Sequence, residues 1–520
     1  MFDNIKNFIK GGFEEINEVF VKPFMALSFY QKCFFIIVAG LLLYVPYMNG
    51  FNATHDEQYT MLMCRFNVWD MIKTISIEDG HPPFSYLYSK FWIELFGGDV
   101  RNIFALRVAT LFEFFMMSML GVFPIKRLLN EKVALLFICF VFVLPSAFYL
   151  VMNMRMYPLA AFLMTGEFVY GMLAVYKPKK SDLFFFGLFS LLALYTHYYC
   201  AILSAVVWGI VFIDFLRLKR YKDLLPLFVC GGIVAVLFAP WLYAFLLQYQ
   251  NMKDTWYPEL RHAFAAIDGA FFSYIYILDI YYRLCLLLGM LCWAFVFEFL
   301  LDVSKEKPEH IIVKRATMVF WSIYIIALLI SLFMRPNLAA IYLAIPVGVF
   351  YVAIAVSVLY FKKYRRLFLC SLFLVFVVGY SENYLKVQDE TYQKISSYLK
   401  EEMPQNSLVL YNHTWGHLMM MFYASEKNIY FAPVERYIVL FQDEVKKDER
   451  LVQNLEQYDK IYYLLSVWDL LEYSNCEQQF VSEYDGISYC FRNLSVEDAA
   501  SLIKRTKTLR NLSFHQKELK

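Results

Sequence analysis

Charged residues are scarce in this chain of 520 residues, since Asp, Glu, Lys and Arg make up only 18% of it. The formal net charge is +2, so there is no bulk positive charge of the kind that nucleic acid attracts. The 10 cysteines include no Cys-x-x-Cys pair, which gives no signal for a zinc site or a redox motif. The sequence also contains no internal repeat and no low-complexity segment. This composition excludes a disordered chain, a coiled coil and a typical cytosolic enzyme.

Apolar residues are abundant instead, at 60% of the chain against about 45–50% in an ordinary soluble domain. The mean hydropathy is +0.47, and many apolar runs approach the roughly 20 residues that a membrane-spanning helix needs. The first run has no small-residue cleavage site, so we expect it to be kept as an anchor. We predict a polytopic helical membrane protein of about eleven spans (up to thirteen), at residues 32–49, 103–125, 133–151, 157–176, 182–197, 200–216, 224–247, 276–301, 316–334, 338–361 and 367–381.

The distribution of Lys and Arg fixes both the count and the orientation, because these residues gather in cytoplasmic loops. The apolar stretch 82–97 is short and contains Lys90 and Glu94, so we predict a helix at the membrane surface. With eleven spans and a cytoplasmic N-terminus, all five basic loops are cytoplasmic. Counting 82–97 as a span would place all five outside. These loops carry Lys126, Arg127 and Lys132; Lys177, Lys179 and Lys180; Arg217, Lys219, Arg220 and Lys222; Lys305, Lys307, Lys314 and Arg315; and Lys362, Lys363, Arg365 and Arg366.

The outer side of a bacterial plasma (inner) membrane then receives a long first loop, short turns and a C-terminal domain. The first loop covers 50–102, the turns lie near 152–156 and 197–199, and a further loop covers 248–275. We therefore expect the first loop and the turns to meet on one face of the bundle.

The composition changes near residue 382, and we divide the chain into a transmembrane domain, 1–381, and a soluble extracytoplasmic α/β domain, 382–520. Cys476 and Cys490 flank a predicted hairpin turn, and a disulfide and two buried thiols are equally good interpretations. The patterns predict helices at 391–402, 415–424 and 445–457, strands at 407–411, 428–432 and 459–465, and a hairpin around Asp485-Gly486.

Unusual polar residues cluster on the predicted outer side. Each has an ordinary explanation: Glu57 can cap a helix, Arg155 can reach lipid phosphates, and His197 lies among tyrosines typical of an interfacial belt. One outer cavity holding carboxylates, arginines and histidines is a simpler explanation than five coincidences. Such a cavity suits a lipid-linked anionic substrate, because cations bind its phosphate and a carboxylate accepts a proton. The residues concerned are Asp56, Glu57, His81, Arg155, His197 and Arg335.

Several short motifs follow one another over residues 30–200. They are Asp56-Glu57 with Tyr59, His81-Pro82-Pro83 before an aromatic helix ending at Gly97, Ala105-Leu106-Arg107, Arg155-Met156-Tyr157 and Tyr195-Thr196-His197-Tyr198. In this order and spacing the chain resembles the membrane glycosyltransferases of the GT-C superfamily, in particular the branch with protein O-mannosyltransferases and aminoarabinose–lipid A transferases. From about 200 to 380 only the pattern of spans agrees, and the C-terminal domain carries no motif.

The resemblance implies transfer of a sugar from a polyprenyl-phosphate donor to a hydroxyl of a lipid, glycan or protein, with inversion. It makes Asp56 the general base and Glu57 its supporting acid, and it places Arg155 and His197 at the donor phosphate. Arg335 is a further candidate for the phosphate. Candidates for the substrate pocket are Tyr59, His81, Tyr86 and Tyr342.

The chain departs from the superfamily pattern at two places. Many members have an acid shortly before the Arg-Met-Tyr motif, where this chain has Met152 and Asn153, so the sequence signals no metal site. No cofactor is required by the implied chemistry, and a divalent metal is left open. Many members also place an arginine directly before the tyrosine of a late span, where this chain has Ile341 before Tyr342, and Arg335 would substitute.

Three other classes of protein are compatible with the outer cations. Acids in the middle of spans and an internal repeat would favour a flippase or transporter of a lipid-linked sugar. A polysaccharide polymerase or ligase would place its arginines in a large late outer loop, whereas the long loop here is the first. A sensor with an active C-terminal domain would leave the acids of the first loop unexplained. The sugar, the prenyl carrier and the acceptor are all left open.

The predicted topology can be checked by cysteine labelling in intact cells. We expect a single cysteine at position 178 to be shielded from an impermeant reagent, because it lies in a basic loop, and one at position 450 to react. Labelling of position 178 from outside would reverse the orientation.

Overall fold

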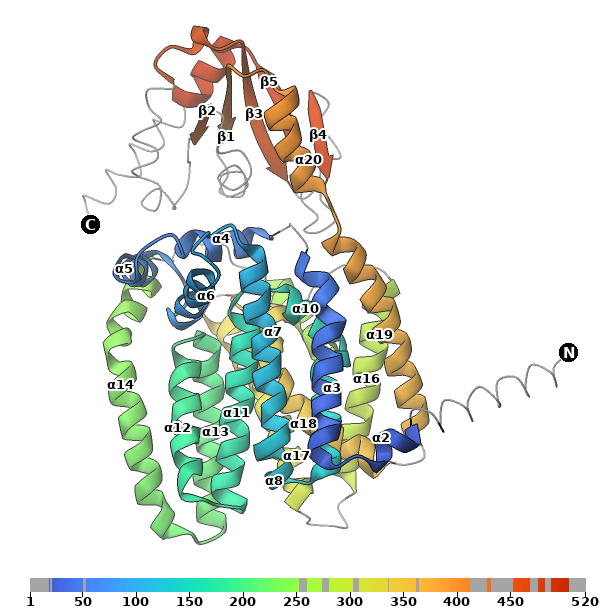
Figure 1. The fold of residues 1–520 in the computed structure, drawn as a ribbon. Helices are drawn as coiled ribbons and strands as arrows, with labels where there is room; N and C mark the ends of the chain where they lie inside the picture. Colours follow the sequence, from blue (N-terminus) through green and yellow to red (C-terminus); the bar gives the residue numbers. More distant parts are fainter. Residues whose placement is uncertain are drawn as a thin grey trace, which may run out of the picture.

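The computed structural model describes residues 18, 21–49, 53–251, 260–273, 280–302, 308–334, 336–361, 364–411, 428–431, 452–467, 476–481 and 488–504. Figure 1 shows a bundle of long helices with a small sheet domain beyond one end of it. Three short helices, α4 (His55–Met63), α5 (Val68–Glu78) and α6 (Phe84–Leu95), lie across the bundle at the end that faces the sheet domain.

A helix or bent helix pair occupies each of the eleven predicted span positions. Eight of these are long and apolar enough to cross a membrane, and the pair α9–α10, bent by 56°, makes a ninth. The other two, α12 and α18, have 15 and 14 residues. The bundle consists of α3 (Phe29–Tyr44), α7 (Ile103–Leu120), α9 (Glu131–Val143), α10 (Pro145–Met152), α11 (Met156–Tyr176), α12 (Lys180–Leu194), α13 (Tyr198–Arg217), α14 (Leu224–Asn251), α16 (Ile280–Leu301), α17 (Pro308–Phe333), α18 (Val347–Tyr360) and α19 (Arg365–Val387).

Short helical segments precede or connect the long helices. They are α2 (Lys22–Ala26), η2 (Val45–Asn49), η3 (Gly121–Ile125), α8 (Lys126–Leu128), η4 (Tyr221–Asp223), α15 (Leu260–Ala265), η6 (Ala266–Phe271) and η7 (Ala340–Ala344). The C-terminal domain contains three more, α20 (Thr391–Ser397), η8 (Tyr398–Glu402) and η11 (Leu455–Gln457). The predicted domain boundary at 381/382 falls inside α19, which runs on to Val387.

The helix α11 is the centre of the bundle, and 89% of its apolar stretch is buried. It contacts α7, α12, α13 and α18. The approach of α18 requires Gly348, because a Cβ there would lie 2.2 Å from the Met117 side chain and 2.1 Å from the hydroxyl of Thr165. The N-terminal end of this fixed helix carries Arg155 as its N-cap residue.

The outer helices begin where the sequence supplies caps. Thr54 and Asn67 accept hydrogen bonds from backbone N–H groups at the starts of α4 and α5. Pro83 precedes α6, whose first N–H, from Phe84, donates to the carbonyl of Tyr195 at 2.9 Å. The predicted helix at 82–97 is thus α6, which is not among the candidate spans of the described chain.

The basic loops meet at the end of the bundle away from α4–α6, where Figure 1 shows α8. Lys177 Nζ donates to the carbonyl of Arg127 at 2.9 Å, and Arg127 pairs with the fully buried Asp182. Arg315 pairs with the buried Asp214, which also accepts from the hydroxyl of Tyr176 at 2.9 Å. Arg217 of a fourth basic loop also lies 3.7 Å from Asp214. The described parts of these four loops are therefore on one side, as the positive-inside rule requires.

The C-terminal domain contains a five-stranded mixed sheet in the order β2-β1-β3-β5-β4. β1 is parallel to β2 and β3, whereas β5 is antiparallel to β3 and β4. Cys476 and Cys490 form a disulfide beside the β4–β5 pair. Most of the predicted helices 415–424 and 445–457 lie outside the described residues. The strands are β1 (Ser407–Tyr411), β2 (Asn428–Phe431), β3 (Lys460–Val467), β4 (Gln478–Val481) and β5 (Ser488–Leu494).

Candidate active site at the outer end of the bundle

Glu57 joins the first loop to the turn before α11. Its Oε2 accepts the backbone N–H of Thr54 at 2.6 Å, and its Oε1 accepts the N–H of Met154 at 2.9 Å. The carboxyl is 1% exposed, and this burial raises its pKa, while the two N–H groups work in the opposite direction. The capping interpretation of Glu57 is therefore right, and the same side chain also fixes the neighbour of Arg155.

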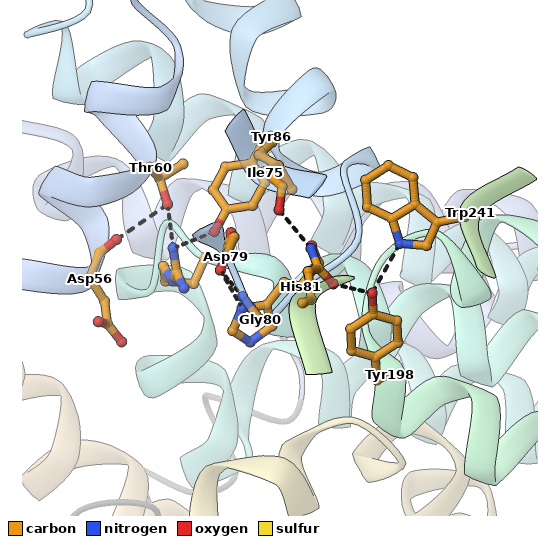
Figure 2. Close-up of polar contacts among 11 residues, drawn as sticks. Asp56, Thr60, Ile75, Asp79, Gly80, His81, Tyr86, Tyr198 and Trp241 are labelled. Carbon is orange, nitrogen blue, oxygen red and sulfur yellow. Dashed lines mark hydrogen bonds and ion pairs between the residues drawn. The ribbon is translucent and has the colours of Figure 1, made fainter. Parts of the chain in front are cut away.

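Asp56 and Thr60 lie one turn apart on α4, so their side chains point to the same face of the helix. The Thr60 hydroxyl donates to the carbonyl of Asp56 at 3.3 Å and accepts from Arg155 Nη1 at 3.0 Å. Figure 2 shows this face, with the Asp56 carboxylate below Thr60. The exposed Asp56 carboxylate therefore lies on the same face of α4 as Thr60, which the half-buried Arg155 contacts.

Arg155 is held on one nitrogen and open on the others. Its Nη1 donates to Thr60 and, at 3.1 Å, to the hydroxyl of Tyr86, which uses both hydrogens. The guanidinium carbon lies 5.9 Å and 5.8 Å from the ring centroids of Tyr59 and Tyr86. Within the described chain, Nε and Nη2 bond to no protein group. These two nitrogens are free to bind a ligand.

The charges around Arg155 keep it protonated. Burial works against the cation, but Tyr86, Asp56 and Asp79 raise the pKa of the guanidinium well above its usual value. Burial would likewise raise the pKa of Asp79, but the hydrogen bond from His81 Nδ1 at 3.1 Å and the charge of Arg155 outweigh it and lower that pKa. The site thus combines at least two carboxylates with a fixed cation.

The loop before α6 carries His81 into this site, and α13 and α14 hold the loop. Gln248 Nε2 donates to the carbonyls of Ile75 at 2.7 Å and His81 at 3.2 Å. Its Oε1 accepts from the hydroxyl of Tyr198, which in turn accepts from Trp241 Nε1 at 3.0 Å. Figure 2 shows the chain of contacts from Trp241 through Tyr198 toward Ile75. We call this chain of contacts the Gln248 latch.

His197, the N-cap of α13, faces His81 at a ring-centroid distance of 5.0 Å. Its Nδ1 accepts the N–H of Tyr199 at 3.1 Å. Burial, with smaller effects of His81 and Arg155, lowers the pKa of His197 well below its usual value. The neutral ring therefore carries its proton on Nε2, which is buried and has no partner among the described residues.

Tyrosines complete the wall around His197. Its ring centroid is 5.7 Å from that of Tyr157 and 5.5 Å from that of Tyr342. Tyr342 stacks on Tyr199 at 4.4 Å, and the Tyr199 hydroxyl donates to the carbonyl of Asn337 at 2.9 Å. This cluster brings residues of α11, α13 and η7 together beside the first loop.

The structure brings together all the candidates that it describes. They are Asp56, Glu57, Tyr59, His81, Tyr86, Arg155, His197 and Tyr342, whereas Arg335 lies outside the described residues. Sequence reasoning missed Asp79 and Gln248 as parts of this site. An acid directly before Gly-His-Pro-Pro was a usable signal for Asp79, but a glutamine at the end of an apolar helix gave none. In the described part of the chain, no three His, Cys, Asp or Glu side chains form a group that could hold a metal.

The protonation of His197 can be measured by NMR of the protein with ¹⁵N-labelled histidine. We expect an unprotonated Nδ1 and a protonated Nε2 from pH 8 to pH 6, because the pKa lies below the usual value of about 6.5. The His197→Asn variant assigns the signals and keeps an acceptor for the N–H of Tyr199. A His197 ring that gains a second proton in this range would contradict the assignment.

No protein-family model matches this chain, and no curated protein matches it. Solved structures do: ArnT from Cupriavidus metallidurans in the apo state has a TM-score of 0.55 at 12% identity, over 90% of this chain and 98% of that one. The same ArnT bound to undecaprenyl phosphate gives a TM-score of 0.53 over the same shares. An oligosaccharyltransferase of Archaeoglobus fulgidus is more distant, with a TM-score of 0.44, 12% identity, and 82% and 67% coverage. The resemblance inferred from the motifs is thus confirmed at the level of the fold: over 90% of its length the chain has the fold of ArnT.

Proposed function

We propose that the chain is a membrane glycosyltransferase that moves a sugar from a polyprenyl phosphate to a hydroxyl acceptor on the outer face of the membrane. The observation that carries the proposal is that the exposed Asp56 carboxylate lies on the face of α4 that Arg155 contacts through Thr60, with Arg155 Nη2 open to a ligand within the described chain. The fold of ArnT, solved with undecaprenyl phosphate bound, supports this choice of donor.

The donor phosphate would be bound by groups that have no partner among the residues that the structure describes. Arg155 offers Nη2, and His197 offers the N–H of Nε2 from the other side of the site. A polyprenyl phosphate is a good leaving group once its charge is stabilised, and it needs no proton. Fixed donors in a buried site stabilise such charge more strongly than water does.

The acceptor hydroxyl needs a base, and Asp56 fits that role. The hydroxyl oxygen attacks the anomeric carbon from the face opposite the phosphate, and its proton passes to Asp56. The bond from the carbon to the phosphate oxygen breaks, and its electrons stay on the phosphate. One displacement inverts the anomeric centre, so no second carboxylate is needed as a nucleophile. Glu57 is already engaged by two backbone N–H groups, which favours a structural role for it.

Two features support an extracytoplasmic site. The basic ends of the helices lie away from α4–α6, and the disulfide between Cys476 and Cys490 belongs to a domain on the same side as α4–α6 (Figure 1). Disulfides persist in oxidising compartments. We therefore place the site and the C-terminal domain outside the plasma membrane.

The role of Arg155 is tested by the binding of undecaprenyl phosphate to the purified chain in nanodiscs. We expect Arg155→Ala to weaken binding about 10- to 100-fold, the loss typical of a hydrogen bond to a charged group. Arg155→Lys should recover only part, because one ammonium cannot serve Thr60, Tyr86 and a phosphate with the geometry of a guanidinium.

Arg101 provides the control, since it is an exposed outer cation that pairs with Asp99. Equal losses in Arg101→Ala and Arg155→Ala would mean that the phosphate responds only to the overall charge of this face.

The role of Asp56 is tested by transfer of labelled sugar from polyprenyl-phosphate donors in isolated membranes. Asp56→Asn keeps the shape of the side chain but cannot take the proton, so we expect roughly a 10²- to 10⁴-fold loss of transfer. Donor binding should stay. Glu57→Gln should lose less activity, with lower thermal stability, because a single amide oxygen cannot accept both backbone N–H groups.

The control for this series is Glu94→Gln, which changes an exposed acid on α6. Normal transfer by Asp56→Asn together with none by Glu57→Gln would move the base to Glu57. If neither variant loses transfer while lipid-linked sugar crosses the membrane, the chain is a transporter.

A further inference from the structure

A small polar pocket lies between α6, α7 and the start of α11. Ser85 and Ser89 come from α6, Thr110 and Glu113 come from α7, and Arg155 also lines it. The free space is about that of one water molecule. An acid in such a pocket needs an explanation, because Glu113 belongs to a candidate membrane span.

Three polar atoms of this pocket lack hydrogen-bond partners among the described residues. They are Ser85 Oγ, Glu113 Oε2 and Arg155 Nε. Ser85 and Glu113 are each 6% exposed, so bulk water does not satisfy them. Buried polar atoms without partners are rare in proteins, and three around one space indicate a bound group.

Two other hydroxyls of the pocket are already committed elsewhere. Thr110 donates to the carbonyl of Leu106 at 3.1 Å, and Tyr88 donates to that of Ala109 at 2.8 Å. Ser89 also lines the pocket but is not bonded to any of the three unpartnered atoms in the described chain, so a bound group is left to satisfy Ser85, Glu113 and Arg155.

The chemistry of these atoms selects the kind of group. Arg155 Nε can only donate, while the carboxyl group of Glu113 can accept. An ammonium cannot accept from Arg155 and is repelled by it, and a phosphate, with its four oxygens, is too large for a space of about one water molecule. A hydroxyl accepts one hydrogen bond and donates another, and its single oxygen fits the available space.

We propose that Glu113, Ser85 and Arg155 form a subsite for one hydroxyl oxygen, either of an ordered water or of the sugar carried by the donor. With water, Glu113 is a positioning residue that fixes the plane of Arg155. With a sugar hydroxyl, the subsite selects the sugar, and this second source rests on the proposed function. Either way Arg155 serves two ligands, the hydroxyl through Nε and the phosphate through Nη2.

The test is a structure of the full chain in nanodiscs at a resolution that shows ordered water, without a ligand and with undecaprenyl phosphate. We expect one oxygen within hydrogen-bonding distance of all three groups in the unliganded chain. Glu113→Leu should remove it, because an apolar side chain replaces the acceptor, and Ser85→Ala should weaken it.

Glu167→Leu is the matched control. Glu167 is also a fully buried acid of a candidate span; its Oε2 accepts from the Ser204 hydroxyl at 2.7 Å, and it does not line this pocket. Its replacement should leave the oxygen in place. If Glu113→Leu does not fold, Ser85→Ala still decides, since it removes only one hydroxyl.

The affinity for undecaprenyl phosphate separates the two sources. A tenfold or greater loss in Glu113→Leu, with none in Glu167→Leu, assigns the oxygen to a water that positions Arg155. Unchanged affinity assigns the subsite to the sugar. A pocket without any oxygen in the wild-type chain, in both states, overturns the proposal. If undecaprenyl phosphate does not bind at all, the proposed function fails while the unliganded structure still decides on the subsite.

Discussion

The arrangement of the outer site depends on one buried carboxylate, that of Glu57. It accepts N–H groups from Thr54 and Met154, which are 100 residues apart in the chain. Asp56 is adjacent to Glu57 in the sequence, and Arg155 is adjacent to Met154. A charged acceptor enclosed between two backbone donors gives strong and directional bonds. Asp56 and Arg155 are thus placed by the same pair of hydrogen bonds, before any contact between their side chains.

A second group of contacts places the histidines. The Gln248 latch holds the carbonyls before α6, and His197 starts α13 as its cap. The helices that supply these contacts, α13 and α14, are long helices of the bundle. His81 and His197 therefore have rigid supports, although each lies in a connection between helices. This is the arrangement that precise sites require, since a group on a loop is positioned only as well as its supporting contacts allow.

Much of the fold could be predicted from the sequence, because a bilayer imposes long apolar helices and gathers the basic loops on one side. The cap at Thr54 and the surface helix after Pro83 followed from local chemistry. Contacts between distant segments could not be predicted in this way. Nothing in the sequence pairs Glu57 with Met154, or Gln248 with the loop before α6. The interest of Glu113 likewise depends on the structure, which places it in one pocket with the unpartnered atoms of Ser85 and Arg155. Such pairings depend on helix packing, which periodicity does not encode.

The buried ion pairs at the basic end have a mechanical consequence. Separating Arg315 from Asp214, or Arg127 from Asp182, would leave charges without partners in a medium of low polarity, at a cost of about 3–5 kcal/mol each. The first pair joins α17 to α13, the second joins α8 to α12, and the hydroxyl of Tyr176 links α11 to Asp214. At the opposite end, the site is held by the hydrogen bonds of Glu57 and Arg155 and by ring packing around His197. The basic end is instead held by opposite charges on neighbouring helices, so a force that separates α13 from α17 there has to break a buried ion pair first.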